Sequence, residues 1–313
     1  MTVTWRALRR DDAEAVAELF AAGETVEPTG EEHSVADIGE SLESPNSPLP
    51  DAGVAVVEGD RLIAYAMTAR RTEADPVHRM RVESMVHPDH RSDALGAELL
   101  RWYEEASAKL HAKVFPGAPL ELHAAAHENQ RWYASVLCRG GYEVVRTIAD
   151  MAADLSALPP IESTVEPVPY EARYEEATRL ALNEAFREHF ASTALTPELF
   201  RHWVTGSAGF QPDLSFLLLD SDRVIALVLC LERGAADGEV VVEYVGTLPE
   251  ARGRGAARSL VAAALRAARA RGYRRAVLGV DSENPTGAQR VYERCGFVVT
   301  GHWHVHARPV SGR

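Results

Sequence analysis

Two kinds of pattern alternate along the chain. Short apolar or alternating stretches have the length of a strand, whose side chains point in turn to opposite faces. Longer stretches place apolar residues three or four positions apart, as at Leu95, Leu99 and Tyr103, which is the spacing of one helix face. The first half is therefore predicted to contain strands at Val3–Leu8, Val54–Glu58, Arg61–Thr68, Met80–Val86 and Leu120–Ala124, with helices at Asp11–Ala22 and from about Ala94.

The second half repeats this order. Helical patterns in "YEEATRLALNEAFREHF" and "TPELFRHWV" come first, and the second begins with threonine and proline, which favour the start of a helix. A later helix follows "LPEARGRGAARSL" and ends at Gly272. The predicted strands are Ser215–Leu219, Val224–Cys230, Val240–Val245, Arg275–Val280 and the terminal "HWHVHARPV".

Matching motifs at corresponding places indicate a tandem repeat. "HPDHRSDALGAELL" aligns with "LPEARGRGAARSL", which sets Arg91 against Arg252. "ENQRWYASVLCRGGY" aligns with "ENPTGAQRVYERCGF", which sets Asn129 against Asn284. Between the halves, "LPPIESTVEPVPY" is rich in proline, which fixes φ and disfavours helix. For a chain of 313 residues we expect two domains, with a linker between them: residues 1–157, linker 158–168, and residues 169–313.

Charge, cysteine content and hydropathy exclude several classes of protein. The formal net charge of −13 argues against broad nucleic-acid binding, because that affinity depends on basic surface. The three cysteines include no closely spaced pair, which argues against a disulfide framework or a zinc finger. No apolar run approaches the roughly 18 residues of a membrane span, and the first residues lack the pattern of a signal peptide. A cytoplasmic protein is expected.

The turn "LPEARGRGAARSL" combines arginines, glycines and small residues between a strand and a helix. A helix N-terminus carries unpaired N–H groups and partial positive charge, and glycine lets the backbone approach an anion closely. The turn matches neither a P-loop, which needs Gly-Lys-Ser/Thr, nor the dinucleotide fingerprint, whose third small residue is replaced by Arg258. It is predicted to hold a phosphate or pyrophosphate through Arg252, Gly253, Arg254, Gly255, Ala256, Ala257 and Arg258.

This turn, taken as Arg252-x-x-Gly255-x-Ala257, and the later "NPTGAQRVYERCGF" together resemble the acyl-CoA-binding core of the GNAT N-acetyltransferase superfamily. The two-copy layout is similar to the mycothiol-synthase type of tandem GNAT protein. The resemblance implies an α/β (α+β) fold of two tandem GNAT domains, each with a mixed, mostly antiparallel sheet flanked by helices. It also implies acetyl-CoA as the co-substrate.

The resemblance assigns binding roles to individual residues. Backbone N–H groups from Gly253 through Arg258 would bind the CoA pyrophosphate. Main-chain groups of Val245 and Thr247 would pair with the pantetheine arm and the acetyl carbonyl, and Asn284 would help to hold that arm.

Acetyl transfer to an amine also needs a base for the ammonium proton and an acid for the leaving thiolate. The resemblance makes Tyr292 the acid; the structural alternative is a residue that packs beside Phe297. Glu243 is the only carboxylate within the strand before the turn and is the candidate base; its alternative is an ordinary carboxylate on a solvated strand face. A histidine of the terminal strand is an alternative base.

The N-terminal copy lacks the features that this chemistry requires. The residues "SDA" at 92–94 replace "GRG" at 253–255, and the aspartate would repel a pyrophosphate. Leu137 stands at the position of Tyr292, although a shift of one helical turn would bring Tyr133 there. We therefore expect only the C-terminal half to be catalytic.

The terminal strand places His302, His304 and His306 on one face and apolar residues on the other. Alternating histidines can bind zinc, but further ligands are not found nearby in the sequence, so no metal site is expected. The apolar face is expected in the core, with the histidines lining a polar groove.

The expected function is acetyl-CoA-dependent N-acetylation of a primary amine by direct transfer in the C-terminal domain. The acidic composition favours a cationic small molecule as acceptor. Neither nucleic acid nor a membrane is an expected partner, and a homodimer is an open alternative to a monomer. Rival interpretations are a protein N-terminal or lysine acetyltransferase, a non-catalytic acyl-CoA-binding module and an unrelated nucleotide-binding protein.

Overall fold

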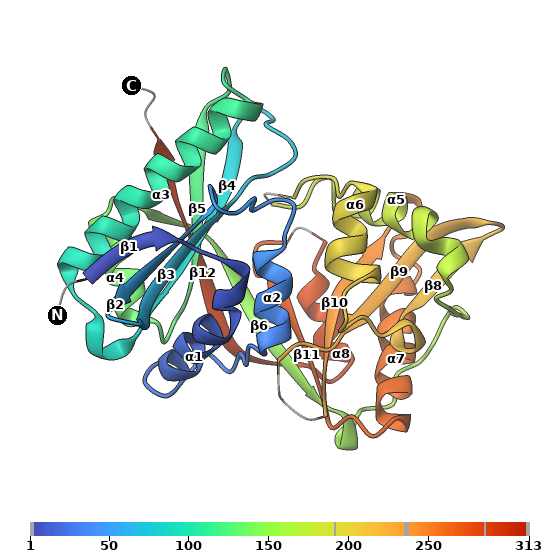
Figure 1. Cartoon of the computed structure of the whole chain (residues 1–313). Helices are drawn as coiled ribbons and strands as arrows, with labels where there is room; N and C mark the ends of the chain where they lie inside the picture. Colours follow the sequence, from blue (N-terminus) through green and yellow to red (C-terminus); the bar gives the residue numbers. More distant parts are fainter. Residues whose placement is uncertain (1–2, 191, 235–237, 285, 311–313) are drawn as a thin grey trace. The chain divides into compact units, whose positions relative to one another are not determined.

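The computed structural model describes residues 3–190, 192–234, 238–284 and 286–310. The chain forms two compact units (Figure 1). The N-terminal unit comprises Met1–Thr147 and His302–Arg313, and the C-terminal unit comprises Ile148–Gly301. Each unit, taken by itself, is a mixed, mostly antiparallel sheet with helices on both faces, so the predicted repeat of elements is confirmed.

The sheet of the N-terminal unit has the order β1-β2-β3-β4-β5, followed by the end of β12 on β5. Its neighbouring strands are antiparallel except β4 and β5, which run parallel. The strands are β1 (Val3–Ala7), β2 (Gly53–Glu58), β3 (Arg61–Ala69), β4 (His78–Val86), β5 (Leu120–His127) and β12 (Val298–Val310).

Helices cover both faces of this sheet. In β3, Tyr65 and Met67 belong to the core under α1 and α2, whereas Ala64 and Ala66 belong to the core under α3 and α4. This two-residue alternation is what lets one strand serve two cores. The helices are α1 (Ala13–Glu24), α2 (Val35–Leu42), α3 (Asp93–Val114) and α4 (Arg131–Arg139).

The C-terminal unit repeats the plan with the order β7-β8-β9-β10-β11, followed by β6 on β11. Here β10 and β11 are the parallel pair. Helices α5 and α6 pack on one face and α7 and α8 on the other. The elements are β6 (Glu143–Asp154), β7 (Val168–Pro169), α5 (Glu175–Phe186), α6 (Pro197–Phe200), β8 (Phe216–Asp220), β9 (Arg223–Leu231), β10 (Glu239–Thr247), α7 (Ala256–Ala270), β11 (Arg275–Asp281) and α8 (Ala288–Arg294).

Strand β6, strand β7 and helix α2 lie outside the sequence-based expectations. Strand β6 is missing from them because its buried alternation runs through Ala149, Met151 and Ala153, which are weak strand formers. Helix α2 begins with a capping box in which the Ser34 hydroxyl accepts from the Asp37 N–H at 3.1 Å. None of the described helices combines the length and the hydropathy that crossing a membrane requires.

The two compact units also differ from the two sequential halves. Strand β6 follows the first repeat but pairs with β11, and β12 follows the second repeat but pairs with β5. Relative to the domains expected at residues 1–157 and 169–313, the units thus exchange their last strands. The sequential boundaries themselves stay a prediction.

Candidate functional site

The N-terminus of α7 carries an open backbone loop. Gly253 and Gly255 have φ values of +76° and +79°, in the left-handed region that favours glycine. Among the described residues, none accepts a hydrogen bond from the N–H groups of Gly253 to Arg258, and Ser259 makes the first N–H bond, to the Gly255 carbonyl at 3.0 Å. Unpaired N–H groups at a helix N-terminus suit an anion.

The arginines of this loop have different environments. The side chains of Arg252 and Arg254 belong to exposed residues, and Arg252 Nε donates to the Thr247 carbonyl at 3.2 Å. Arg258 Nε is buried, as is the Thr247 hydroxyl, and neither has a hydrogen-bond partner among the described residues. The Thr247 carbonyl, expected at the pantetheine arm, is thus already engaged by Arg252.

Strand β10 separates from β11 before it reaches this loop. Their parallel pairing covers only residues 239–241, whereas on its other edge β10 pairs with β9 as far as Thr247. The register with β9 shifts at Glu243, which therefore occupies a β-bulge, an irregularity that redirects a side chain. Val245 and Thr247 lie on the part of β10 that has left β11, where an extended ligand can add to the strand edge.

The candidate base Glu243 is accessible and paired. Its side chain is 25% exposed, and its carboxylate lies 3.3 Å from Arg233 Nε. The next residue, Tyr244, packs edge-on against Phe186 of α5 with ring centroids 6.0 Å apart. A base at this position would share its carboxylate with Arg233.

The candidate acid Tyr292 lies on α8 in the core of the C-terminal unit. Its residue is 8% exposed, and its ring meets Phe297 at 6.0 Å between centroids. Burial raises the pKa of the Tyr292 phenol above its ordinary value, which keeps the proton in place for donation. The contact with Phe297 agrees with the structural alternative, so the catalytic role stays a prediction.

Asn284 closes the turn that leads into α8. Its Oδ1 accepts hydrogen bonds from the Thr286 N–H at 2.9 Å and the Thr286 hydroxyl at 2.7 Å. This is an Asx turn, which orders the loop. It leaves the side-chain nitrogen Nδ2 of Asn284 for another partner. Pro285 of the motif lies outside the described residues.

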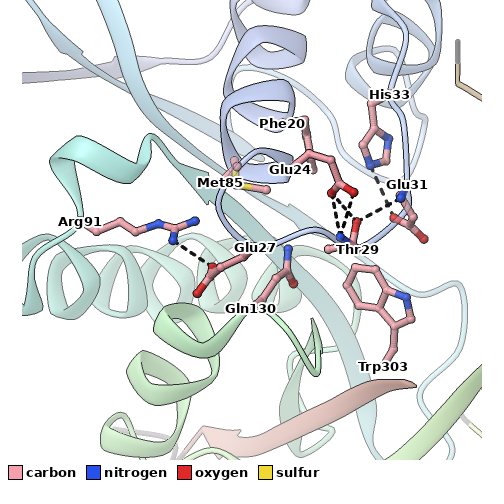
Figure 2. A pocket seen from close by; sticks show the side chains of 11 residues that line it. Phe20, Glu24, Glu27, Thr29, Glu31, His33, Met85, Arg91, Gln130 and Trp303 are labelled. Atoms are coloured by element: carbon pink, nitrogen blue, oxygen red, sulfur yellow. Dashed lines mark hydrogen bonds and ion pairs between the residues drawn. The ribbon is translucent and has the colours of Figure 1, made fainter. Parts of the chain in front are cut away.

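In the N-terminal unit, the two residues aligned with motif residues Arg252 and Asn284 bind the unit's own chain. Parallel pairing of β4 with β5 ends at Val82, as that of β10 with β11 ends early. Near the end of β4, a pocket is lined by residues that include Met85, Glu27 and Trp303 (Figure 2). Figure 2 shows Arg91, the counterpart of Arg252, pointing at Glu27, and their N and O atoms are 2.9 Å apart.

Two further contacts fix this segment. The Glu27 carboxylate accepts from the Trp132 N–H at the start of α4, at 3.1 Å. Asn129, the counterpart of Asn284, donates its side-chain amide to the Pro28 carbonyl at 2.7 Å. The two motif residues of the N-terminal copy therefore bind Glu27 and Pro28. Sequence reasoning missed these partners because their polar segment shows no periodic pattern.

The helix that follows is capped by its own residue. The Ser92 hydroxyl accepts from the Leu95 N–H at 3.2 Å, so α3 begins at Asp93, two residues after Arg91, whereas α7 begins four residues after Arg252. Asp93 pairs with Arg139 at 2.7 Å.

The two residues that can be aligned with Tyr292, Leu137 and Tyr133, both lie in the core of the N-terminal unit. Leu137 is completely buried in its core. The Tyr133 hydroxyl lies 3.0 Å from the buried Tyr103 hydroxyl. Leu137 has no proton to give. Tyr133, at 9% exposed, is as buried as Tyr292 and differs from it in the hydrogen bond to Tyr103.

The histidines of β12 belong to the N-terminal unit. The prediction that the histidines line a polar groove is wrong for His306. This residue is 3% exposed because it pairs with Ala124 on the buried face of β5. His302 lies 3.4 Å from Glu128, and His304 lies 3.2 Å from the Thr147 hydroxyl. Over the described ranges no group of three potential ligands could hold a metal ion.

Comparisons with known proteins identify the family and the fold. The family described as "Acetyltransferase (GNAT) family" matches residues 175–297. A protein named "Mycothiol acetyltransferase" from Streptomyces scabiei (strain 87.22) is 31% identical over 246 residues, which are 77% of this chain and 74% of that protein.

Solved structures match the whole chain. A GCN5-related N-acetyltransferase from Sphaerobacter thermophilus has a TM-score of 0.77 and 26% identity, over 98% of this chain and 95% of that one. A tandem GNAT protein from the clavulanic acid biosynthesis pathway has a TM-score of 0.73 and 16% identity, over 100% of both chains, and shows similarity of fold.

Proposed function

The chain belongs to the acetyltransferase (GNAT) family of N-acetyltransferases that use acetyl-CoA, and on that premise we propose that its C-terminal unit transfers the acetyl group to a primary amine of a small molecule. The predicted fold of two tandem GNAT domains is confirmed. The proposal concerns which copy is active, which residues act and what accepts the acetyl group.

The open loop before α7 is the observation that carries the proposal. Its N–H groups, Gly253 through Arg258, find no acceptor among the described residues, and two left-handed glycines hold them in that arrangement. The pyrophosphate of acetyl-CoA supplies the acceptors. The pantetheine arm then extends along the edge of β10 at Val245 and Thr247, with the Asn284 amide beside it.

The reaction is a direct transfer without an enzyme-bound acetyl group. The neutral amine attacks the thioester carbonyl, a C–N bond forms and the C–S bond breaks. Tyr292 gives its proton to the leaving thiolate, and Glu243 takes the proton that the amine loses. The bulge at Glu243 and the buried phenol of Tyr292 support these roles.

The N-terminal unit is proposed to be non-catalytic. Glu27 and Pro28 use the side chains of Arg91 and Asn129, which correspond to motif residues of the other copy. Acetyl-CoA would have to displace this segment and the largely buried ion pair within it. The unit therefore supports the fold and does not perform acetyl transfer.

The most specific part of the proposal is the identity of the acceptor amine. Because relatives are named mycothiol acetyltransferase, the deacetylated form of mycothiol is the first small amine to test. The protein-acetyltransferase and acyl-CoA-binding alternatives from the sequence are outcomes of the same assay.

The test is steady-state release of the CoA thiol from acetyl-CoA with three acceptors: deacetylated mycothiol, a simple diamine and a peptide with a free N-terminus. We expect turnover with a small amine and about a thousandfold lower kcat in Tyr292→Phe. Preferred turnover of the peptide would indicate a protein acetyltransferase. Binding of acetyl-CoA without turnover of any amine would contradict the proposal and favour a binding module.

A further inference from the structure

The segment between the two repeats packs on the C-terminal unit. Leu158 and Ile161 are partly buried against the core that contains Leu260 and Tyr292. At the end of α8, a Cβ atom on Gly296 would lie 2.7 Å from Pro159 Cδ, so this segment runs directly over the turn that follows Tyr292. The first residues of the predicted linker therefore pack against the part of the unit that contains the candidate acid Tyr292.

The same segment contacts the loop before α7 through Thr164. The Thr164 N–H donates to the hydroxyl of the buried Ser259 at 3.0 Å. The Thr164 hydroxyl donates to the Arg254 carbonyl at 2.9 Å. A Cβ atom on Gly255 would lie 2.5 Å from Thr164 Oγ1, so glycine is required there by this approach as well as by its positive φ.

The hydrogen bond to Arg254 has a consequence for the anion loop. Arg254 and Gly255 share a trans peptide, and in a planar trans peptide the C=O and N–H groups point in opposite directions. A carbonyl held by Thr164 therefore turns the Gly255 N–H away from the linker. That N–H group is one of those left without an acceptor at the start of α7.

We infer that Thr164 is a positioning residue for the acetyl-CoA pyrophosphate, acting through the Arg254–Gly255 peptide. The inference rests on the proposed function, in which this loop binds the pyrophosphate. Thr164 touches no reacting atom; it holds the peptide in the orientation that the bound anion needs, before the anion arrives. The linker between the repeats thereby becomes part of the co-substrate site.

The test compares Thr164→Val with Thr164→Ser in the full chain. Valine keeps the shape and the backbone N–H but removes the hydroxyl donor, whereas serine keeps the donor. We expect Thr164→Val to raise the Kd and KM for acetyl-CoA about five- to tenfold, the range for one hydrogen bond, with kcat at saturation unchanged. Thr164→Ser should restore wild-type values to within about twofold.

A second probe separates positioning from general packing. S-acetylpantetheine carries the acetyl group and the arm but no phosphate, so its KM should be the same in wild type and Thr164→Val. Equal losses for both compounds, or no change in the KM for acetyl-CoA, would overturn the inference. If wild type and Gly255→Glu bind acetyl-CoA equally well, the proposed function fails instead, because the loop is then not the binding site.

Discussion

The helix N-termini of α7 and α3 occupy equivalent places in the two repeats but treat their backbone groups in opposite ways. Before α7, two left-handed glycines hold a loop whose N–H groups find no acceptor among the described residues. Before α3, Ser92 caps the helix and Asp93 adds a negative charge. The α7 end leaves backbone N–H groups without an acceptor among the described residues, and the α3 end caps one of its own N–H groups through Ser92.

The aligned arginines before these helices differ in the same sense. Arg252 lies exposed near an open strand edge, whereas Arg91 is 12% exposed and paired with Glu27. The fold is common to both copies, so activity must depend on a few local residues and not on architecture. On the proposed assignment, the comparison teaches that the side chains of a binding motif can be engaged by the protein's own chain while the scaffold is kept.

The largest expected difference between the copies is catalytic. Tyr292→Phe should lower kcat about a thousandfold, because the thiolate loses its proton donor. Tyr133→Phe should leave kcat within about twofold, because that hydroxyl bonds to Tyr103 inside its own core. Steady-state kinetics on the amine with the highest turnover measures both. A comparable fall in both variants would mean that the N-terminal copy takes part in the reaction.

Next in size is the effect of a carboxylate at each helix N-terminus. Gly255→Glu forces a side chain against Thr164 and a negative charge onto the loop, so acetyl-CoA affinity should fall about 100-fold or more. Ala94→Glu, at an exposed position, should leave affinity unchanged. Calorimetric titration distinguishes them, and a matching loss in Ala94→Glu would refute the assignment of the site.

For stability the order of the two copies should reverse, with substitution of Arg91 costing more than substitution of Arg252. Arg91→Ala leaves the largely buried Glu27 carboxylate without its cationic partner, with the Trp132 N–H still donating to it, and should lower the free energy of unfolding by about 2 kcal/mol. Arg252→Ala, at an exposed residue, should cost less than about 0.5 kcal/mol. Urea denaturation monitored by tryptophan fluorescence provides the measurement. Equal destabilisation by the two substitutions would mean that the Arg91–Glu27 ion pair adds no measurable free energy of unfolding.

The smallest expected effect concerns pH. A phenol donates its proton only below its pKa, and burial raises the pKa of Tyr292 above the ordinary 10.0. At saturating substrates, kcat should therefore change by less than about twofold between roughly pH 8 and pH 9.5. A fall of kcat with a midpoint in that range, absent in Tyr292→Phe, would show that the phenol ionises earlier than its environment predicts.

The sequence predicted those features that local patterns encode. Apolar alternation located β9 and β10 to within two residues, and the glycines at 253 and 255 predicted the loop that their left-handed φ values form. Strand β6 escaped because alanine and methionine carry its buried face. The contacts of Thr164 with Ser259 and of Glu27 with Trp132 join residues 95 and 105 positions apart, and no local pattern encodes such pairs.

The central claim is that one copy binds acetyl-CoA and the other fills its own groove. Calorimetric titration of the full chain with acetyl-CoA, analysed for stoichiometry, tests it most directly. We predict one site per chain, lost in Gly255→Glu. Two sites per chain, or one site that survives Gly255→Glu, would contradict the account, because the segment at Glu27 would then not exclude the co-substrate from the N-terminal unit.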